Sequence, residues 1–310
     1  MAKSIPFGPR ATADKVLAGI DLTGRHFVVT GCNSGIGFET MSALAANGAH
    51  VIGLARSLED AKTACDAVGL SATPVAGDLA DLDSVAAAID AIRRLQTPLD
   101  AVVANAGIAY LPALESRYGV EMQFLVNHIG HFALVNGLLD LVRNDTGRIV
   151  VVSSDAAVKH APAAGIMFDN LDGRRFYDPR LFYAQSKLAN ALFAKELSRR
   201  LGSRGIAVNS VHPGATRNTR LHKNLGLPRR IAVAAAGLFM KSTARGAATQ
   251  ALLAANPQVA GITGEFWSNC QIAPGNPLLS DTGLARRLWE LSESIVAPHA
   301  PAAKALRKAA

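Results

Sequence analysis

Tyr183 and Lys187 form the residue pair in this sequence that is best suited to acid–base chemistry. They stand four positions apart in the segment YAQSK, so on a helix their side chains are neighbours on one face. A free tyrosine titrates at about pH 10, which is too high for proton transfer at neutral pH. Because a neighbouring ammonium group favours the phenolate, we expect Lys187 to lower the pKa of Tyr183. A surface tyrosine with an unrelated lysine is the alternative for such a pair taken alone.

Two serines could add a hydroxyl to this pair. Ser153 and Ser154 stand at the end of the apolar run RIVVVSS, which predicts a buried strand. At the carboxyl end of a parallel strand, a side chain can point into a ligand crevice. A hydroxyl there can donate to a substrate oxygen as negative charge develops on it. The strand pattern alone leaves both serines open.

A glycine-rich turn indicates a phosphate-binding site. Gly31, Gly35 and Gly37 lie in the segment TGCNSGIG, between an expected strand at 26–30 and an expected helix at 37–47. Glycines let the backbone turn tightly and approach a ligand closely. The start of a helix presents free N–H groups and a positive dipole end to a pyrophosphate. A tight turn without a ligand is the alternative, but the turn opens the first strand–helix–strand unit, as a dinucleotide site requires.

Short apolar runs alternate along the chain with longer segments of helical period. Strands are expected at 26–30, 50–54, 73–76, 99–104, 148–153 and 206–211, and helices at 37–47, 58–68, 84–95, 118–143 (one helix or two) and 183–201. The strand runs do not alternate with polar residues, which is typical of strands buried on both faces. The sequence therefore predicts an α/β fold: one doubly wound, Rossmann-like parallel sheet with helices on both faces.

Composition excludes several classes of protein. The 310 residues are 49% hydrophobic and carry 32 basic against 24 acidic side chains, so the chain can bury a large core and is not disordered. Three distant cysteines exclude a disulfide-stapled module and a zinc-built fold. Aromatic residues make up 5%, too few for a nucleic-acid stacking surface. We expect a single domain at 21–296, an N-terminal extension at 1–20 and a basic tail at 297–310.

No targeting signal is evident in the sequence. The first 20 residues lack the apolar segment of a signal peptide, and the apolar run at 231–240 is about half of a membrane span. We therefore expect a cytoplasmic protein without a transmembrane segment.

Five segments resemble the motifs of the short-chain dehydrogenase/reductase family. The glycine turn has the family spacing T-G-x-x-x-G-x-G, and YAQSK matches Y-x-x-x-K. The other three follow expected strands in the family order: Asp78-Leu79, Asn105-Ala106-Gly107 and Pro213-Gly214. The resemblance covers roughly 22–294. The segments NHIGHF, FDNLDGRRFYDPRLFYAQSKLAN and RLWELSE are similar to the branch of retinol dehydrogenases and related carbonyl reductases.

The resemblance implies roles for individual residues. It selects Ser154 as the catalytic hydroxyl, beside Tyr183 and Lys187. It implies that Asn127 bends its helix and holds a water for proton relay; a helix-distorting residue without proton traffic is the alternative. The cofactor contacts that we predict are Gly31, Asn33, Ser34, Gly35, Ile36, Gly37, Arg56, Asp78, Leu79, Asn105, Ala106, Gly107, Tyr183, Lys187, Pro213, Gly214 and Thr216.

The end of the second expected strand indicates which nicotinamide cofactor is bound. Family members that use NAD tend to carry an acidic residue there, which accepts from the ribose hydroxyls. Here the segment is LARS, with no acid and with Arg56 at that site. Because a guanidinium suits a 2′-phosphate, we predict NADP(H) in preference to NAD(H). A solvated loop arginine is the alternative.

No metal site is predicted. His128 and His131 are three positions apart, but no third ligand accompanies them at a suitable spacing, so packing is the preferred interpretation. Cys32 stands inside the glycine turn, where a tolerated small residue is preferred over a redox-sensitive thiol.

Two regions depart from the common family pattern. Between Ser154 and Tyr183 lie 28 residues, and the extra segment at 162–180 resembles an insertion that in some relatives covers a dimerisation face. A monomer and a homodimer therefore both remain open. After Pro213-Gly214, Asn218 stands where a threonine is usual, and Thr219 is the alternative contact.

The region at 215–245 corresponds to the substrate lid of the family. Its apolar segment LGLPRRIAVAAAGLFMK predicts a lipophilic substrate. A helix that makes weak contact with a membrane surface is the alternative.

Together these features predict an NADP(H)-dependent oxidoreductase that interconverts an alcohol and a ketone or aldehyde. The expected substrate is retinoid-, steroid- or aromatic-carbonyl-like. The alternatives are a reductase of activated C=C bonds on the same scaffold and, less favoured, a non-catalytic dinucleotide sensor or a sugar-nucleotide epimerase.

Overall fold

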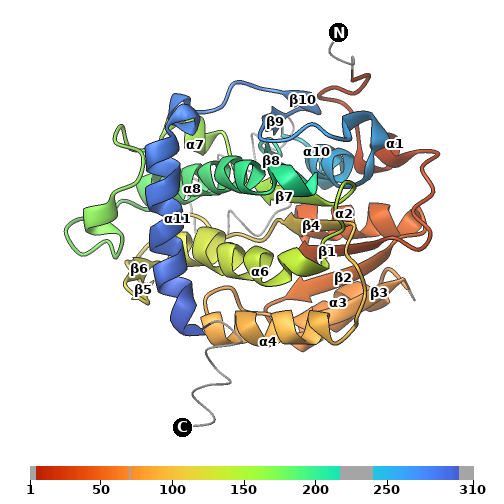
Figure 1. The fold of residues 1–310 in the computed structure, drawn as a ribbon, viewed down its shortest axis with the longest axis horizontal. Coiled ribbons are helices and arrows are strands. Elements are labelled where there is room, and N and C mark those ends of the chain that lie inside the picture. The colour runs from red at the N-terminus through yellow and green to blue at the C-terminus, as the bar shows by residue number, and fades with distance from the viewer. Residues whose placement is uncertain (1–4, 70, 217–239, 300–310) are drawn as a thin grey trace.

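The computed structural model describes residues 5–69, 71–216 and 240–299, and an eight-stranded sheet lies at the centre of this part of the chain (Figure 1). The strand order is β10-β9-β8-β7-β4-β1-β2-β3, and only β10 runs antiparallel to its neighbour. The strands are β1 (His26–Thr30), β2 (His50–Ala55), β3 (Ala72–Ala76), β4 (Ala101–Ala104), β7 (Arg148–Val152), β8 (Ala207–His212), β9 (Phe266–Ser268) and β10 (Gln271–Ile272). The predicted doubly wound parallel sheet is confirmed.

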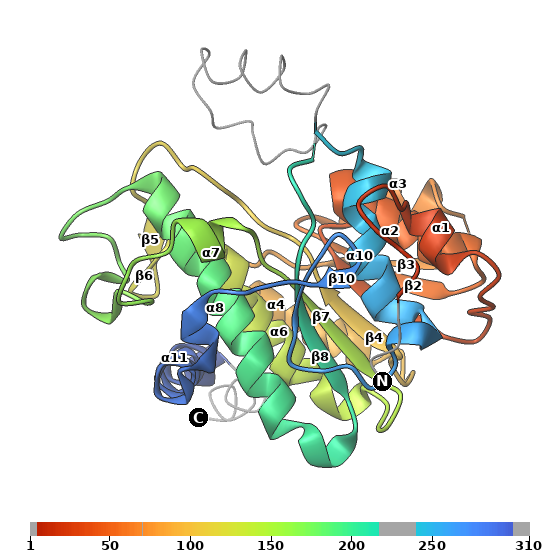
Figure 2. The ribbon, with the colours of Figure 1, turned by 90° about the horizontal axis from the view of Figure 1, so that it is seen from above.

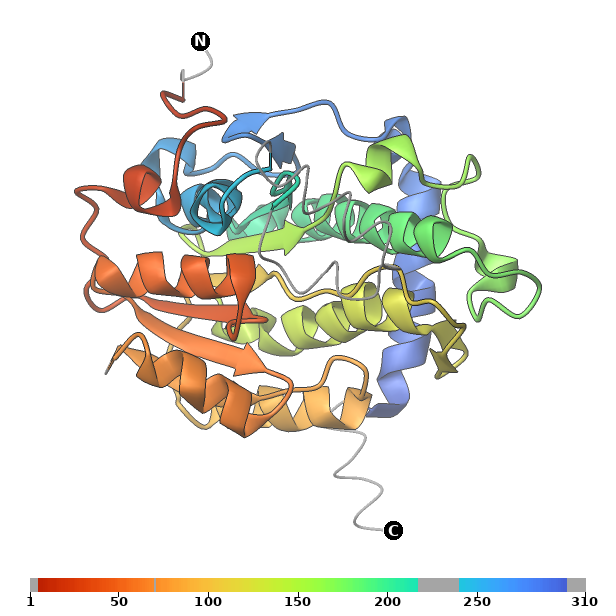
Figure 3. The same ribbon diagram turned by 180° about the vertical axis from the view of Figure 1, so that it is seen from behind.

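Helices cover both faces of the sheet, which explains why its strands are apolar throughout. In β1, Phe27 and Val29 pack into one core and Val28 into the other. One face carries α2 (Gly35–Ala46), α3 (Leu58–Asp66) and α10 (Thr243–Ala255), with α1 (Ala13–Leu17) beside them (Figure 3). The other face carries α4 (Leu82–Arg93), α6 (Gly130–Leu138) and α8 (Pro179–Arg200), and α11 (Thr282–Val296) lies outside α6 and α8 (Figure 2).

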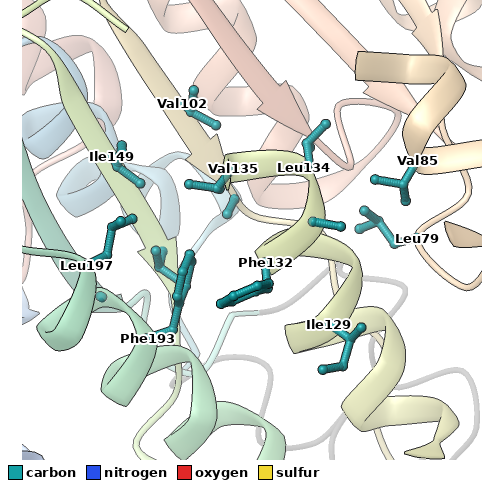
Figure 4. Close-up of a cluster of buried hydrophobic side chains, with 14 of the residues drawn as sticks. Leu79, Val85, Val102, Ile129, Phe132, Leu134, Val135, Ile149, Phe193 and Leu197 are labelled. Carbon is teal, nitrogen blue, oxygen red and sulfur yellow. The ribbon is translucent and has the colours of Figure 1, made fainter. Parts of the chain in front are cut away.

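An aromatic cluster attaches α11 to this face. The rings of Phe132 on α6 and Phe193 on α8 lie 5.3 Å apart and point toward each other (Figure 4). The Trp289 ring of α11 lies 4.9 Å from Phe132, and the guanidinium of Arg200 lies 4.0 Å from the Trp289 ring. Truncation of such a buried aromatic residue to alanine typically costs about 3–5 kcal/mol. The outer faces of α6 and α8 are therefore covered by the chain itself.

The segment expected to form one or two helices at 118–143 is more broken than predicted. It begins with β6 (Val120–Glu121), which forms a hairpin with the preceding β5 (Ser116–Arg117), and continues with α5 (Met122–Phe124), a π-helical turn at Leu125–Ile129, and α6. Side-chain bonds from Asn127 to the backbone of Ile108 accompany the irregular turn. A π-helical turn often marks a functional site.

Several elements were not predicted: β9, β10, α1, α10, α11 and the short α7 (Ala156–Lys159). Helix α1 lies within the expected N-terminal extension, yet its Val16 and Leu17 are buried. The side-chain amide of Asn256 donates to the Val16 carbonyl at 2.7 Å, which ties α1 to the end of α10.

One stretch of the described residues, Met122–Leu141, is long and apolar enough by composition to cross a bilayer. In the structure 67% of its most apolar window is buried inside the fold, as is typical of a core helix.

Candidate active site

The strand order reverses between β1 and β4, and the carboxyl ends of the strands meet there at one edge of the sheet. Ligands of doubly wound sheets bind in the crevice at such a reversal. Strand β1 runs into the glycine turn and β4 into Asn105-Ala106-Gly107, while β7 runs into the two serines. Strand β8, next to β7, runs into Pro213-Gly214. The topology therefore brings these four predicted segments to one edge of the sheet.

Helix α8 brings Tyr183 and Lys187 to this edge. It begins one turn earlier than expected, because Asp178 caps its first turn and Pro179 occupies the first helical position. Both side chains are buried, and Nζ of Lys187 lies 5.9 Å from the Tyr183 ring centroid. Nζ donates to the Val152 carbonyl at 3.0 Å. The predicted pair therefore lies beside the end of β7.

Burial dominates the titration of this pair. It raises the pKa of Tyr183 above its usual value, although a hydrogen bond with the Ser154 hydroxyl opposes the shift. It lowers the pKa of Lys187 to about 8. In the protein without a nicotinamide, desolvation of the phenolate therefore determines the direction of the Tyr183 pKa shift.

The two serines after β7 have different surroundings. The Ser153 hydroxyl donates to the Lys187 carbonyl at 2.6 Å, so it holds the backbone of α8. The Ser154 hydroxyl donates to Oδ1 of Asp155 at 3.4 Å and accepts from the Ala156 N–H at 3.2 Å. It also lies close enough to the Tyr183 hydroxyl to lower the pKa of that phenol. The structure therefore brings Ser154, and not the hydroxyl of Ser153, to the phenol.

Asn127 lies in the π-helical turn, with its side chain held from two sides. Oδ1 accepts from the Ile108 N–H at 2.8 Å, and Nδ2 donates to the Ile108 carbonyl at 3.0 Å and to the Ser186 hydroxyl at 2.9 Å. A Cβ built on Gly107 would lie 3.1 Å from Oδ1 of Asn127 and 3.3 Å from Nζ of Lys187. The absence of a side chain at Gly107 thus lets Asn127 and Lys187 approach its backbone closely.

The glycine turn fits the pyrophosphate of a dinucleotide. Gly31 and Gly35 have left-handed φ values of +67° and +57°, and a Cβ on Gly37 would lie 2.2 Å from the Gly31 carbonyl oxygen. Ser34 is the N-cap of α2, but its side chain makes no cap hydrogen bond. The first amides of α2 therefore lack that partner and suit an anionic group. The remaining predicted members of this turn, Asn33 and Ile36, are partly buried in it.

The segment after β4 locks β4 to β1. Nδ2 of Asn105 donates to the Thr30 carbonyl at 2.8 Å. The backbone N–H groups of Asn105 and Ala106 donate to the Thr30 hydroxyl, each at 2.9 Å. These bonds hold the edge of the crevice together.

The predicted cofactor contacts Asp78 and Leu79 follow β3. Oδ1 of Asp78 accepts from the Ala80 N–H at 3.0 Å, which fixes the turn. The Leu79 side chain is buried, and its carbonyl would lie 2.5 Å from a Cβ on Gly130 of α6. The Leu79 side chain thus packs against a core helix. Leu79 can then contact a ligand only through its backbone.

Arg56 is exposed directly after β2, and the described part of the chain shows no carboxylate within ion-pair distance of it. A hollow of about 510 Å³ adjoins the neighbouring Ser57. Its lining residues are Asn33, Phe38, Ser57, Glu59, Asp60, Thr63, Ala64 and Ala67. Arg56 thus adjoins, through Ser57, a hollow that carries both neutral polar side chains and the carboxylates of Glu59 and Asp60.

The loop after β8 is held by Lys241. Nζ of Lys241 donates to the Pro213 carbonyl at 3.3 Å, and Gly214 has a left-handed φ of +93°. The Thr216 hydroxyl donates to the Gly214 carbonyl at 3.1 Å. Asn218, Thr219 and most of the expected lid at 215–245 lie outside the described residues.

Three further side chains lie at the site without having been predicted. The Tyr110 ring lies 5.1 Å from the Tyr183 ring, and its backbone has a left-handed φ of +57°. Asp155 lies 3.9 Å from Nε2 of His212 and follows Ser154 directly. In the sequence, Asp155 and His212 are marked only by their position next to a family motif, Ser154 and Pro213-Gly214 respectively. No feature of the sequence indicates Tyr110.

The described residues hold no cluster of three or more potential metal ligands. His128 and His131 are both buried and hydrogen-bonded, His128 to Ser292 of α11 and His131 to Thr30. Burial raises the pKa of the Cys32 thiol to about 12, so it stays protonated at neutral pH.

Comparison with known proteins agrees with this geometry. The family model described as short chain dehydrogenase matches residues 25–166. The chain is 36% identical to the chloroplastic short-chain dehydrogenase TIC 32 B of Brassica napus, over 94% of both chains. It is 36% identical to retinol dehydrogenase 14 of Mus musculus, over 88% of this chain and 86% of that protein. An uncharacterized protein of Mycobacterium Paratuberculosis has a crystal structure that matches with a TM-score of 0.73 at 31% identity, covering 91% of this chain and 96% of that chain.

The resemblance predicted from the five motifs is thereby confirmed. Members of this family use a nicotinamide dinucleotide and act on small alcohols and carbonyl compounds. The chain belongs to the short-chain dehydrogenase/reductase family of oxidoreductases.

Proposed function

We propose that this protein is an NADP(H)-dependent oxidoreductase that interconverts a lipophilic alcohol and its ketone or aldehyde. The observation that carries the proposal is the meeting of Tyr183, Lys187 and Ser154 at the crevice beside the glycine turn. A phenol, an ammonium and a hydroxyl in such an arrangement suit proton transfer to a carbonyl oxygen.

Each side chain has one task in carbonyl reduction. When bound, the nicotinamide supplies the hydride, which the resemblance implies comes from its B face. The Ser154 hydroxyl donates to the carbonyl oxygen of the substrate and holds it beside the phenol. Tyr183 then donates its proton to that oxygen, and the Lys187 ammonium stabilises the phenolate that remains. Asn127 and Lys187 both lie close to Gly107, and we propose that a water held beside these two residues returns the proton.

Ser154→Ala is expected to lower kcat by about 10²-fold, which is typical for the loss of one donor to a developing oxyanion. Ser153→Ala is the matched control, because its hydroxyl instead holds the Lys187 carbonyl. It should mainly lower the free energy of unfolding, by about 1–3 kcal/mol. Steady-state kinetics and thermal unfolding of both variants check this. A larger loss of kcat in Ser153→Ala would reverse the assignment.

Arg56→Asp is expected to lower the preference for NADPH over NADH by roughly 10- to 100-fold. The reason is that a hydrogen bond to a charged group contributes about 1.5–3 kcal/mol, and the new carboxylate repels a 2′-phosphate. The ratio of kcat/KM for the two cofactors measures the effect. Arg94→Asp on the far end of α4 is the control for a change in net charge. An unchanged ratio in Arg56→Asp would remove Arg56 as the determinant.

The surroundings of Tyr183 support a lipophilic substrate. Tyr183 belongs to a small buried cluster with Ala109, Ala156 and Ala184, and the Tyr110 ring packs against it. Apolar and aromatic walls of this kind favour an apolar substrate. A relative named as a retinol dehydrogenase is consistent with this class.

The proposed function is tested by NADPH oxidation with a panel of ketones, aldehydes and enones. We expect turnover of apolar ketones or aldehydes to the alcohol. Reduction of only the C=C bond of an enone would favour the alternative reductase, and cofactor binding without any turnover would favour a sensor. We further propose a single domain that acts in the cytoplasm, with no nucleic-acid partner. On its N-terminal side the domain extends beyond the expected 21–296, because Val16 and Leu17 of α1 are buried in the same core.

A further inference from the structure

A buried chain of hydrogen bonds links β1 to the π-helical turn through His131. Nε2 of His131 lies 2.8 Å from the Thr30 hydroxyl, and Nδ1 lies 2.9 Å from the Asn127 carbonyl oxygen. All three residues are fully buried. Thr30 and His131 are 101 positions apart, so only the fold brings them together.

The direction of each bond follows from the partners of Thr30. Its hydroxyl oxygen already accepts the N–H groups of Asn105 and Ala106, both at 2.9 Å. A hydroxyl has two acceptor sites and one proton, so that proton is left for Nε2 of His131. Nδ1 of His131 therefore carries the ring proton and donates it to the Asn127 carbonyl. Burial and the nearby charge of Lys187 lower the pKa of His131 to about 4, so the ring stays neutral near pH 7.

We propose that His131 is a positioning residue for proton supply: it fixes the main-chain carbonyl of Asn127, and with it the π-helical turn that holds the Asn127 side chain near Lys187 at Gly107. The inference rests on the proposed function, in which a water held beside Asn127 and Lys187 returns the proton. Ile108 and Ser186 hold the side chain of Asn127, and His131 holds its backbone. A π-helical turn departs from the regular i→i+4 ladder of backbone bonds, and within this turn His131 gives the Asn127 carbonyl a side-chain donor.

His128 provides a contrast within the same helix. It is also buried, but its Nε2 lies 2.9 Å from the Ser292 hydroxyl, which itself donates to the Leu288 carbonyl of α11. The His128 ring contacts Phe124 and Phe193 of the core. His128 therefore faces away from the crevice and is a matched control for His131.

The test compares three variants of the full chain. His131→Phe keeps a ring but loses both bonds. His131→Asn keeps one donor, because an asparagine on a helix can donate to the carbonyl four residues earlier, as Asn136 does to Phe132 at 2.8 Å. His128→Phe is the control.

We expect His131→Phe to lower kcat by about tenfold and to raise the solvent isotope effect on kcat, because proton return becomes slower. KM for the cofactor should not change. His131→Asn should recover most of the loss in kcat. His128→Phe should reduce thermal stability without a change in kcat or in the isotope effect.

The proposal is overturned if His131→Phe keeps the parent kcat and isotope effect, or if His131→Asn loses as much as His131→Phe. Should His131→Phe not fold, His131→Leu takes its place. Amide hydrogen exchange over 122–131 provides a readout that does not need activity: exchange should be faster in His131→Phe and restored in His131→Asn. An inactive parent protein would refute the proposed function, whereas unchanged exchange would refute the positioning role alone.

Discussion

Replacing Tyr183 with phenylalanine is expected to lower kcat for carbonyl reduction by about 10³-fold, because the hydroxyl that donates the proton is lost. The ring stays, so its contact with Tyr110 and the fold around it are retained. Cofactor affinity should change little, because the glycine turn is untouched. Single-turnover kinetics with the cofactor and a reactive ketone, together with a binding titration of the cofactor, measure both quantities.

Tyr110→Phe is the matched control for this variant, because it removes the neighbouring phenol and keeps the ring. We expect Tyr110→Phe to retain kcat to within about tenfold. Equal losses in the two variants, or an active Tyr183→Phe protein, would show that the proton comes from another group.

Gly37→Ala is expected to abolish tight cofactor binding, with a loss of affinity on the order of 10²-fold. The added Cβ would lie 2.2 Å from the Gly31 carbonyl oxygen and 2.5 Å from Nδ2 of Asn105, so the turn itself must shift. Overpacking of this kind typically costs about 1–3 kcal/mol of stability. A shifted turn also misplaces the amides that would face the pyrophosphate.

Gly202→Ala is the control for Gly37→Ala, because a Cβ on Gly202 meets no other atom within 4 Å. Thermal unfolding and a cofactor titration should separate the two variants. If Gly37→Ala binds the cofactor as tightly as Gly202→Ala does, the glycine turn is not the phosphate site.

The central strands could be predicted from the sequence because burial on both faces leaves a local signature. The expected strands at 26–30 and 50–54 correspond to β1 and β2 to within one residue. Helix α10 was not predicted, because it is rich in alanine and buried on nearly all sides. Such a helix has no polar face, so its sequence shows no periodic alternation of polar and apolar residues. Strand β9, with three residues, is too short to form a pattern.

The candidate site was predictable only where its parts are local. Tyr183 and Lys187 share a helix, so their spacing alone brings them together. Which of the two serines faces the phenol depends on how α8 packs against the end of β7, and the sequence does not contain that contact. The same holds for the pairing of His131 with Thr30, which are far apart in the chain.

The bond from Lys187 to the Val152 carbonyl bears on how quickly the site can work. Lysine is among the side chains with the most rotamer freedom to lose, about 1.5–2 kcal/mol when it is fixed. Nζ of Lys187 is anchored at 3.0 Å, and the amide of Asn190 donates to the same carbonyl at 3.0 Å. The rotamer entropy of Lys187 is lost once, when the protein folds. The Lys187 ammonium is therefore already held in place when a ligand binds, and the catalytic cycle does not include the cost of ordering this side chain.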